Sequence, residues 1–265
     1  MHWASLEHVA NELRFTVSRI KETSISVCLW LLAGSLFLCF GLLYLLLAFV
    51  VPIRHLHVLG RWMCRLALMC GGQRLIVNGR FPDPKEGPFI YVFNHTSMLD
   101  TLIMIALLPE HTNAVGKKEQ FDVPIWGWII KRWGALPIDR ADRAAAIATL
   151  DVVGESFANG HSLLVAPEGT RSPTGALAPF KKGPFHLAGR YQVPILPVVI
   201  RGAFASKHRG DWRLRPNRIS IDILPPIRPG DVDGQACVDA LHKETHAAFQ
   251  HHLERHAHSK NASLE

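Results

Sequence analysis

The stretch Phe89-Ile-Tyr-Val-Phe-Asn-His-Thr-Ser-Met-Leu-Asp100 decides how the rest of the chain is interpreted. Its first five residues are aromatic or β-branched, which predicts a short buried strand. The apolar segment 101–108 that follows ends before a proline and predicts a helix. His95 is therefore expected just beyond the carboxyl end of a strand, in a turn that leads into a helix.

His95 and Asp100 stand five residues apart, and within a regular helix they would point about 140° away from each other. In a strand-to-helix turn the two side chains can meet. An aspartate that accepts a hydrogen bond from one imidazole nitrogen fixes the tautomer and leaves the other nitrogen free to take a proton. The pair could therefore be a general base. In the alternative interpretation, Ser97-x-x-Asp100 is a helix capping box and His95 is an ordinary loop histidine.

Three further blocks follow in order, namely Gly134-Ala-Leu-Pro-Ile-Asp-Arg140, Glu168-Gly-Thr-Arg-Ser172 and Val193-Pro-Ile-Leu-Pro197. Together with the His-x4-Asp pair they resemble the lysophosphatidic acid acyltransferase family of glycerolipid acyltransferases. A single His-x4-Asp is weakly specific, whereas four blocks in order between Phe89 and Arg201 are strongly specific.

The resemblance implies transfer of an acyl chain from an acyl thioester to the free hydroxyl of 1-acyl-glycerol-3-phosphate, which gives phosphatidic acid for phospholipid synthesis. His95 would be the general base and Asp100 its partner. The acyl donor would be acyl-coenzyme A or the acyl thioester of acyl carrier protein. The resemblance implies that the reaction uses no cofactor and no metal. Backbone N–H groups at the helix start after Ser97 are expected to stabilise the oxyanion.

Lys117, Arg140 and Arg171 each follow a predicted strand, and the planar guanidinium of arginine suits phosphate. We expect Arg140 and Arg171, helped by Lys117, to hold the phosphate of lysophosphatidic acid. The competing interpretation is that these residues form local ion pairs on a solvated face, which contribute little to stability.

The block that begins at Glu168 predicts a tight loop. Gly169 permits a close approach of the backbone to a ligand. Glu168 could orient Arg171, and Thr170 could hydrogen-bond to the acceptor or cap a turn.

Three other functions compete with this one. The first is the same chemistry on another acceptor, such as glycerol 3-phosphate, another lysophospholipid or a lyso-aminolipid. The second is a lipid hydrolase with Ser97 or another serine as nucleophile, which the lack of a G-x-S-x-G motif disfavours. The third is a non-catalytic membrane-surface or nucleic-acid-binding protein, but much of the basic charge lies inside the blocks. We therefore expect no nucleic-acid partner.

The N-terminal region indicates a membrane anchor. Residues 23–53 carry no charge and exceed the roughly 20 residues needed to cross a bilayer. They lie between amphipathic segments at 3–20 and 55–70, with Pro52 closing the apolar run. Basic residues flank the run almost equally, so a full span and a hairpin dipping into one leaflet both stay open. The resemblance implies the cell (inner) membrane, with the catalytic domain on its cytoplasmic side.

The 265 residues, 48% of them hydrophobic, suffice for one catalytic domain plus an anchor. The net charge of +7 favours an anionic partner, such as a lipid surface, a phosphorylated substrate or nucleic acid. We expect an anchoring segment at 1–72 and an acyltransferase domain at 73–265. Strands are expected at 74–78, 89–93, 114–115, 135–138, 162–166, 195–200 and 219–224, and helices at 101–108, 125–133, 142–158 and 232–256. This alternation predicts an α/β fold, a mixed and largely buried sheet flanked by helices, and the resemblance implies a glycerol-3-phosphate acyltransferase-like form of it.

Overall fold

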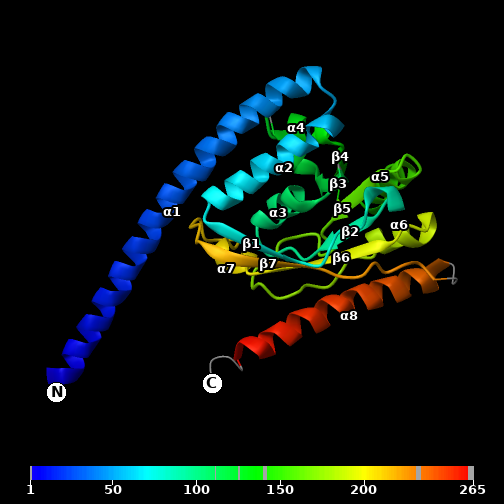
Figure 1. Cartoon of the computed structure of the whole chain (residues 1–265). Coiled ribbons are helices and arrows are strands. Elements are labelled where there is room, and N and C mark those ends of the chain that lie inside the picture. Colours follow the sequence, from blue (N-terminus) through cyan, green and yellow to red (C-terminus); the bar gives the residue numbers. More distant parts are fainter. Residues whose placement is uncertain (1, 111, 125, 140–141, 231–233, 262–265) are drawn as a thin grey trace.

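The computed structural model describes every residue except 1, 111, 125, 140–141, 231–233 and 262–265. Its centre is a sheet of seven strands in the order β1-β7-β6-β2-β5-β3-β4 (Figure 1). The strands are β1 (Gln73–Asn78), β2 (Ile90–Phe93), β3 (Thr112–Lys117), β4 (Ala135–Ile138), β5 (Ser162–Val165), β6 (Ile195–Arg201) and β7 (Asn217–Ile223). Every predicted strand is present, and β3 extends furthest beyond its predicted residues.

The sheet is mixed, as predicted. Neighbouring strands run parallel except for β6 and β7, so β1 and β7 point opposite to the other five. Parallel neighbours need a long crossover, and helices supply it. The helices are α1 (His2–Val50), α2 (Ile53–Cys70), α3 (Leu99–Leu107), α4 (Trp126–Trp133), α5 (Arg143–Phe157), α6 (Gly183–Tyr191), α7 (Ala203–Ser206) and α8 (Gly234–Asn261), with short 3-10 turns at Pro84–Glu86 and Lys118–Asp122.

Side chains alternate between two cores along the central strand β2. Phe89, Tyr91 and Phe93 pack on the face covered by α2 and α3. Ile90 and Val92 pack on the opposite face, with α5, α6 and α8. A strand buried on both faces is a nearly continuous apolar run, which is why this segment lacks polar alternation.

Several helix predictions need correction. Helix α3 begins at Leu99, two residues earlier than predicted, so Asp100 lies in its first turn. The sequence predicts neither α6 nor α7, because glycines at 183, 189 and 202 weaken the apolar pattern there. The residues predicted to begin the helices at 125 and 232 lie outside the described residues, and α4 and α8 follow them.

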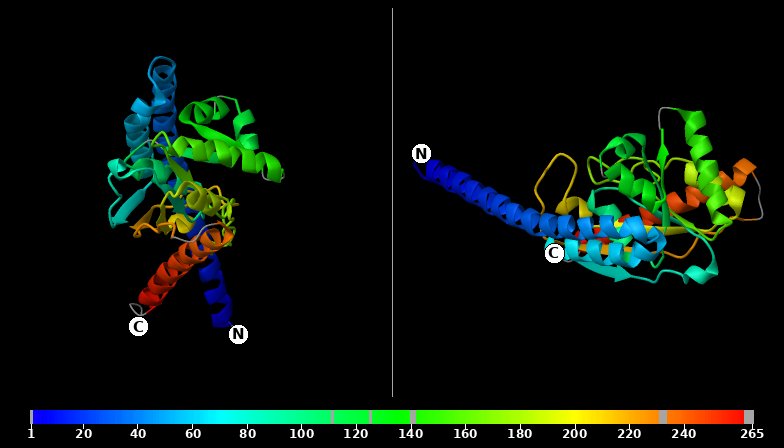
Figure 2. Two further views of the ribbon diagram at one scale, coloured as in Figure 1. Left: turned by 90° about the vertical axis from the view of Figure 1, so that its right-hand side faces the viewer. Right: turned by 90° about the horizontal axis from the view of Figure 1, so that it is seen from above.

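Helix α1 is one continuous element of 49 residues, not an amphipathic helix followed by a separate apolar segment. It is about 74 Å long at 1.5 Å per residue. Lys21–Ser24, at the predicted join, contains no glycine or proline to break the helix. Its N-terminal part projects beyond the α/β layers (Figure 2). Residues 11–50 are long and apolar enough to cross a membrane, by length and composition.

Helices α1 and α2 form a hairpin whose turn contains Pro52, where the apolar run was predicted to close. Cys64 and Leu68 of α2 belong to the same core as β2, and Leu29 and Trp30 of α1 pack against that core. The division at residue 72 stays a prediction. The described packing makes α2 part of the helical layer over the sheet.

Candidate active site

The carboxyl ends of three neighbouring parallel strands meet at one edge of the sheet. Strand β2 leads into the turn with His95, β5 into the loop with Glu168, and β6 through Gly202 and α7 into a loop that begins at Lys207. Ligands of open α/β sheets bind at this edge, because the loops beyond the carboxyl ends converge there. The topology thus brings the first and third sequence blocks side by side.

His95 and Asp100 are in direct contact. The imidazole Nδ1 lies 3.1 Å from the Asp100 Oδ2. The His95 side chain is 20% exposed while that of Asp100 is fully buried, so the ring bridges a buried carboxylate and the surface. The His95 ring also packs against the Phe93 ring in a T-shaped arrangement, with ring centroids 5.7 Å apart. An imidazole held through Nδ1 leaves Nε2 to exchange a proton.

Asp100 also organises the turn. Its Oδ2 accepts hydrogen bonds from the backbone N–H groups of Thr96 and Ser97 at 2.6 and 2.7 Å. Half of the predicted capping box is therefore present, because Asp100 accepts the Ser97 N–H while the Ser97 Oγ accepts from Leu99 and not from Asp100. The Oδ2 that contacts His95 is also the oxygen that accepts the Ser97 N–H. The other oxygen, Oδ1, is buried and has no hydrogen-bond partner among the described residues.

The expected oxyanion donors are engaged within the turn. Leu99 donates its N–H to the Ser97 Oγ at 3.2 Å, and the Asp100 N–H lies 3.4 Å from the Ser97 carbonyl oxygen. These donors were expected to face a ligand because they open a helix. Both donate to Ser97 instead, one to its hydroxyl and one to its carbonyl oxygen.

Glu168 braces the turn from the neighbouring strand. Its carboxylate accepts the His95 N–H at 2.7 Å and the Ala178 N–H at 3.2 Å, so its partners are backbone groups and not the guanidinium of Arg171. Burial raises the pKa of Glu168, although these two N–H donors oppose the rise. A buried carboxylate that holds the backbone of His95 positions the ring without contacting it.

Three further contacts fix the turn. The amide of Asn94 forms a pair of hydrogen bonds with the backbone of Ile200, at 2.7 and 2.9 Å, and thereby joins the ends of β2 and β6. The Ser172 N–H donates to the His95 carbonyl oxygen at 2.8 Å. The Ser97 Oγ donates to the Lys207 carbonyl oxygen at 2.5 Å. Each flanking loop is therefore bonded to the backbone or side chain of the turn.

Four of the remaining predicted site residues lie at the same edge with different surroundings. Lys117, at the end of β3, is exposed and pairs with Glu119 at 3.0 Å. Gly169 has a φ of 74°, and a Cβ there would approach the Lys181 side chain to 3.0 Å. Thr170 is exposed and Arg171 half-buried. Arg140 lies outside the described residues.

The chain is similar to known proteins over most of its length. Residues 74–201 match the family model described as Acyltransferase. The 1-acyl-sn-glycerol-3-phosphate acyltransferase of Salmonella typhimurium is 34% identical over 197 residues, which cover 73% of this chain and 78% of that protein. The chain belongs to the 1-acyl-sn-glycerol-3-phosphate acyltransferase family.

Other comparisons agree with this acyltransferase family. The 1-acyl-sn-glycerol-3-phosphate acyltransferase of Cocos nucifera is 32% identical over 198 residues, which cover 74% of this chain and 62% of that protein. The match to the protein of the same name from Limnanthes alba covers 51% of its length, so the chain spans less than two thirds of these plant relatives. The crystal structure of the 1-acyl-sn-glycerophosphate (LPA) acyltransferase, PlsC, from Thermotoga maritima shares the fold, with a TM-score of 0.74 at 22% identity over 89% of this chain and 97% of that one.

Two residues beside the acyltransferase blocks were not predicted to support the site. Asn94 carries a signal that could have been found, since an amide at a strand end can donate to and accept from one backbone residue at once. Lys207 carries none, because 110 positions separate it from Ser97 and no pattern connects the two.

Proposed function

We propose that this protein transfers an acyl chain from an acyl thioester to the free hydroxyl of 1-acyl-glycerol-3-phosphate and so makes phosphatidic acid. The observation that carries the proposal is the 3.1 Å contact between His95 Nδ1 and Asp100 Oδ2 at the edge of the sheet where loops converge. Two relatives that bear the name 1-acyl-sn-glycerol-3-phosphate acyltransferase support the choice of acceptor.

In the proposed reaction the acceptor oxygen attacks the thioester carbonyl while His95 Nε2 takes the hydroxyl proton. The tetrahedral intermediate then collapses, the carbon–sulfur bond breaks, and the thiolate leaves and receives the proton. Asp100 holds the Nδ1–H tautomer and stabilises the transient imidazolium, as a buried carboxylate does for a catalytic histidine. No covalent enzyme intermediate is required.

The phosphate of the acceptor needs cations at the same edge of the sheet. We assign this role to Arg171, with Arg140 and Lys117 as further candidates, and Gly169 and Thr170 as the backbone and hydroxyl beside it. The thioester is acyl-coenzyme A or acyl carrier protein, and the reaction needs no cofactor.

We further propose that α1 places the protein at the cell (inner) membrane with the sheet on the cytoplasmic side. A helix about 74 Å long exceeds the thickness of a bilayer core more than twofold. Ala33, Tyr44 and Ala48 are buried against the protein, whereas Leu38, Leu42 and Leu46 are exposed. Helix α1 thus has one side packed on the protein and one exposed apolar side. This favours a hairpin that lies in one leaflet, rather than a helix that fully spans the membrane.

The test compares acceptors. Detergent-solubilised full-length protein is assayed with lysophosphatidic acid, lysophosphatidylcholine and glycerol 3-phosphate, each with acyl-coenzyme A and with acyl carrier protein thioester. Preference for lysophosphatidic acid is the expected result. Preference for an acceptor without a terminal phosphate monoester would remove the assigned role of Arg171 and favour the same chemistry on another lipid.

A further inference from the structure

Two cations flank the His95 turn from opposite sides. Arg171 precedes Ser172, whose N–H donates to the His95 carbonyl oxygen at 2.8 Å. The Lys207 carbonyl oxygen accepts a hydrogen bond from the Ser97 hydroxyl at 2.5 Å. Lys207 thus bonds directly to the turn through its backbone, and Arg171 is next in sequence to a residue that does.

Neither cation has an anionic partner in the part of the chain that the structure describes, since no ion pair there involves Arg171 or Lys207. Lys207 is only 9% exposed, and its ammonium donates to the neighbouring carbonyl oxygen of His208 at 3.1 Å. The pKa of Lys207 is lowered, chiefly by burial and next by repulsion from Arg171. Arg215 lowers this pKa further, whereas the negative charge of Asp211 raises it. A buried ammonium beside a second cation is stabilised when an anion binds between them.

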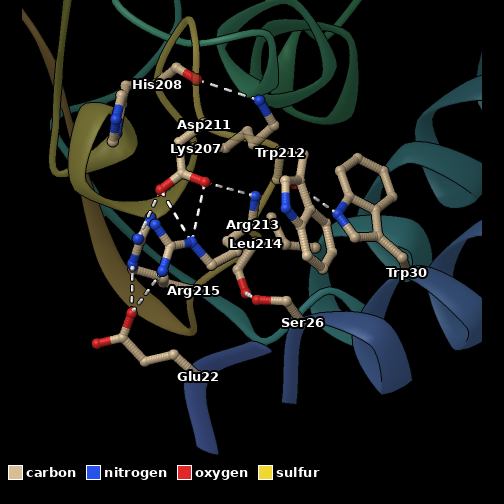
Figure 3. Close-up of polar contacts among 10 residues, drawn as sticks. All are labelled: Glu22, Ser26, Trp30, Lys207, His208, Asp211, Trp212, Arg213, Leu214 and Arg215. Carbon is tan, nitrogen blue, oxygen red and sulfur yellow. Dashed lines mark hydrogen bonds and ion pairs between the residues drawn. The ribbon is translucent and has the colours of Figure 1, made fainter. Parts of the chain in front are cut away.

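The loop that carries Lys207 is held in place by helix α1 (Figure 3). The Ser26 hydroxyl donates to the Leu214 carbonyl oxygen at 2.9 Å, and the Trp30 indole N–H donates to the Trp212 carbonyl oxygen at 2.9 Å. The Arg215 N–H closes the base of the loop on the Ser206 carbonyl oxygen at 2.9 Å. Lys207 therefore occupies a fixed place at the rim of the site.

Two carboxylates also stabilise this loop. Asp211 accepts from the Arg213 Nε at 3.0 Å and from the Arg215 Nη2 at 2.7 Å. Glu22 of α1 lies 3.8 Å from Arg213 and 3.5 Å from Arg215. These two arginines are thus partly neutralised. Lys207 is the buried cation of the loop without an ion pair among the described residues, whereas Arg209 is exposed.

We propose that Lys207 is a substrate-binding residue that, together with Arg171, holds the phosphate monoester of the acceptor. This inference rests on the proposed function. A phosphate monoester carries a charge of about −1.5 to −2 at neutral pH, which two fixed cations match, whereas the single charge of a phosphodiester does not require both. Lys207 stands outside the sequence blocks, so a selectivity for the monoester would come partly from a loop that α1 holds.

The test measures acceptor KM for Lys207→Met, which keeps the buried stem and removes the charge. Lys207→Arg is the conservative rescue, Lys207→Gln is a second neutral variant, and Arg209→Gln is the matched control that removes an exposed cation from the same loop. Each is assayed with lysophosphatidic acid and with 1-monoacylglycerol. Lys207→Met should raise the KM for lysophosphatidic acid about 10- to 100-fold, the loss of one hydrogen bond to a charged group, and leave 1-monoacylglycerol and the thioester unchanged.

Five results would overturn the proposal. Equal losses on both acceptors would show a structural role for Lys207, and a raised KM for the thioester would assign the cation to the phosphates of the donor. An unchanged acceptor KM in Lys207→Met and Lys207→Gln, or an equal effect in Arg209→Gln, would exclude a specific contact. A wild-type protein that does not prefer lysophosphatidic acid to 1-monoacylglycerol would defeat the proposed function itself, before any variant is made.

Discussion

The turn 94–100 and the loop 207–215 flank one site but are built in different ways. The turn is held largely by its own residues, because Asp100 bonds to His95, Thr96 and Ser97 within five positions of itself. The loop is held by helix α1, through contacts that span 188 positions between Ser26 and Leu214 and 182 between Trp30 and Trp212. Local hydrogen bonds leave a motif in the sequence, whereas long-range ones leave none.

This difference also predicts that the turn and the loop have separate roles. The turn is rigid and carries the proposed base, so changes there should affect the chemical step. The loop carries a cation beside the site and depends on helix α1, so changes there should affect acceptor binding and stability. The following changes test that division.

The largest expected effect follows from His95→Ala. A general base contributes about 10²- to 10⁴-fold to rate, or about 3–5 kcal/mol of transition-state stabilisation. Turnover should fall by that factor while thermal stability changes little, since the braces of the turn use the backbone of His95 and not its ring. Single-turnover acyl transfer and a melting curve measure both. A folded variant with near-normal turnover would show that another group is the base.

A smaller effect is expected from Asp100→Asn. The asparagine oxygen can take the place of Oδ2 and keep its three hydrogen bonds, while its NH2 group takes the place of Oδ1. That NH2 group would be buried without a partner among the described residues, at a stability cost of about 1–3 kcal/mol. Replacing a charge-assisted bond to imidazolium by a neutral one should slow transfer about 10- to 30-fold.

The comparison for Asp100→Asn is the double variant His95→Ala/Asp100→Asn, assayed in the same way. If Asp100 acts through the ring, the second change should add almost nothing to the first. Additive losses would instead assign Asp100 a role in transfer that does not pass through His95.

The parts of the structure that the sequence predicts are those held by local contacts, as in the turn, and not those held by long-range contacts, as in the loop. The strand pattern around β2 is local, and every strand was found where its apolar run lies. The start of α3 and the continuity of α1 were missed because both depend on capping and propensity over only a few residues. Glu168 was expected to orient Arg171 and instead holds the backbone of His95, because burial favours carboxylate contacts with N–H groups inside the turn.

The site was predictable only where its residues are close in sequence or fall in a block. His95 and Asp100 could be paired from their spacing, and the parallel order of β2 and β5 brings Glu168 to them. Lys207 reaches the site because β6 lies on the other side of β2, a neighbour relation that no sequence pattern encodes. Lys117 was expected beside the phosphate and is paired with Glu119.

The smallest expected effect is from Asp211→Asn in the loop. Hydrogen bonds from Arg213, joined by Arg215, hold the pKa of Asp211 well below its usual range. A carboxyl whose pKa is lower in the folded state stabilises the fold above its unfolded pKa of about 4, and that stabilisation is lost as the pH falls toward the folded value. The variant should therefore melt a few degrees below the wild type at pH 7, and the gap should shrink below about pH 4.

The matched control for Asp211→Asn is Asp239→Asn, since Asp239 also pairs with a cation, Lys182 at 2.7 Å, but is about half exposed. An exposed pair contributes about 0–1 kcal/mol, so its loss should move the melting temperature little at any pH. Asp211→Asn should in addition raise the acceptor KM modestly without changing transfer to 1-monoacylglycerol, because it loosens the loop behind Lys207 and leaves the turn intact. A fall in turnover on both acceptors would mean that loop and turn act as one unit, and the division between them would be wrong.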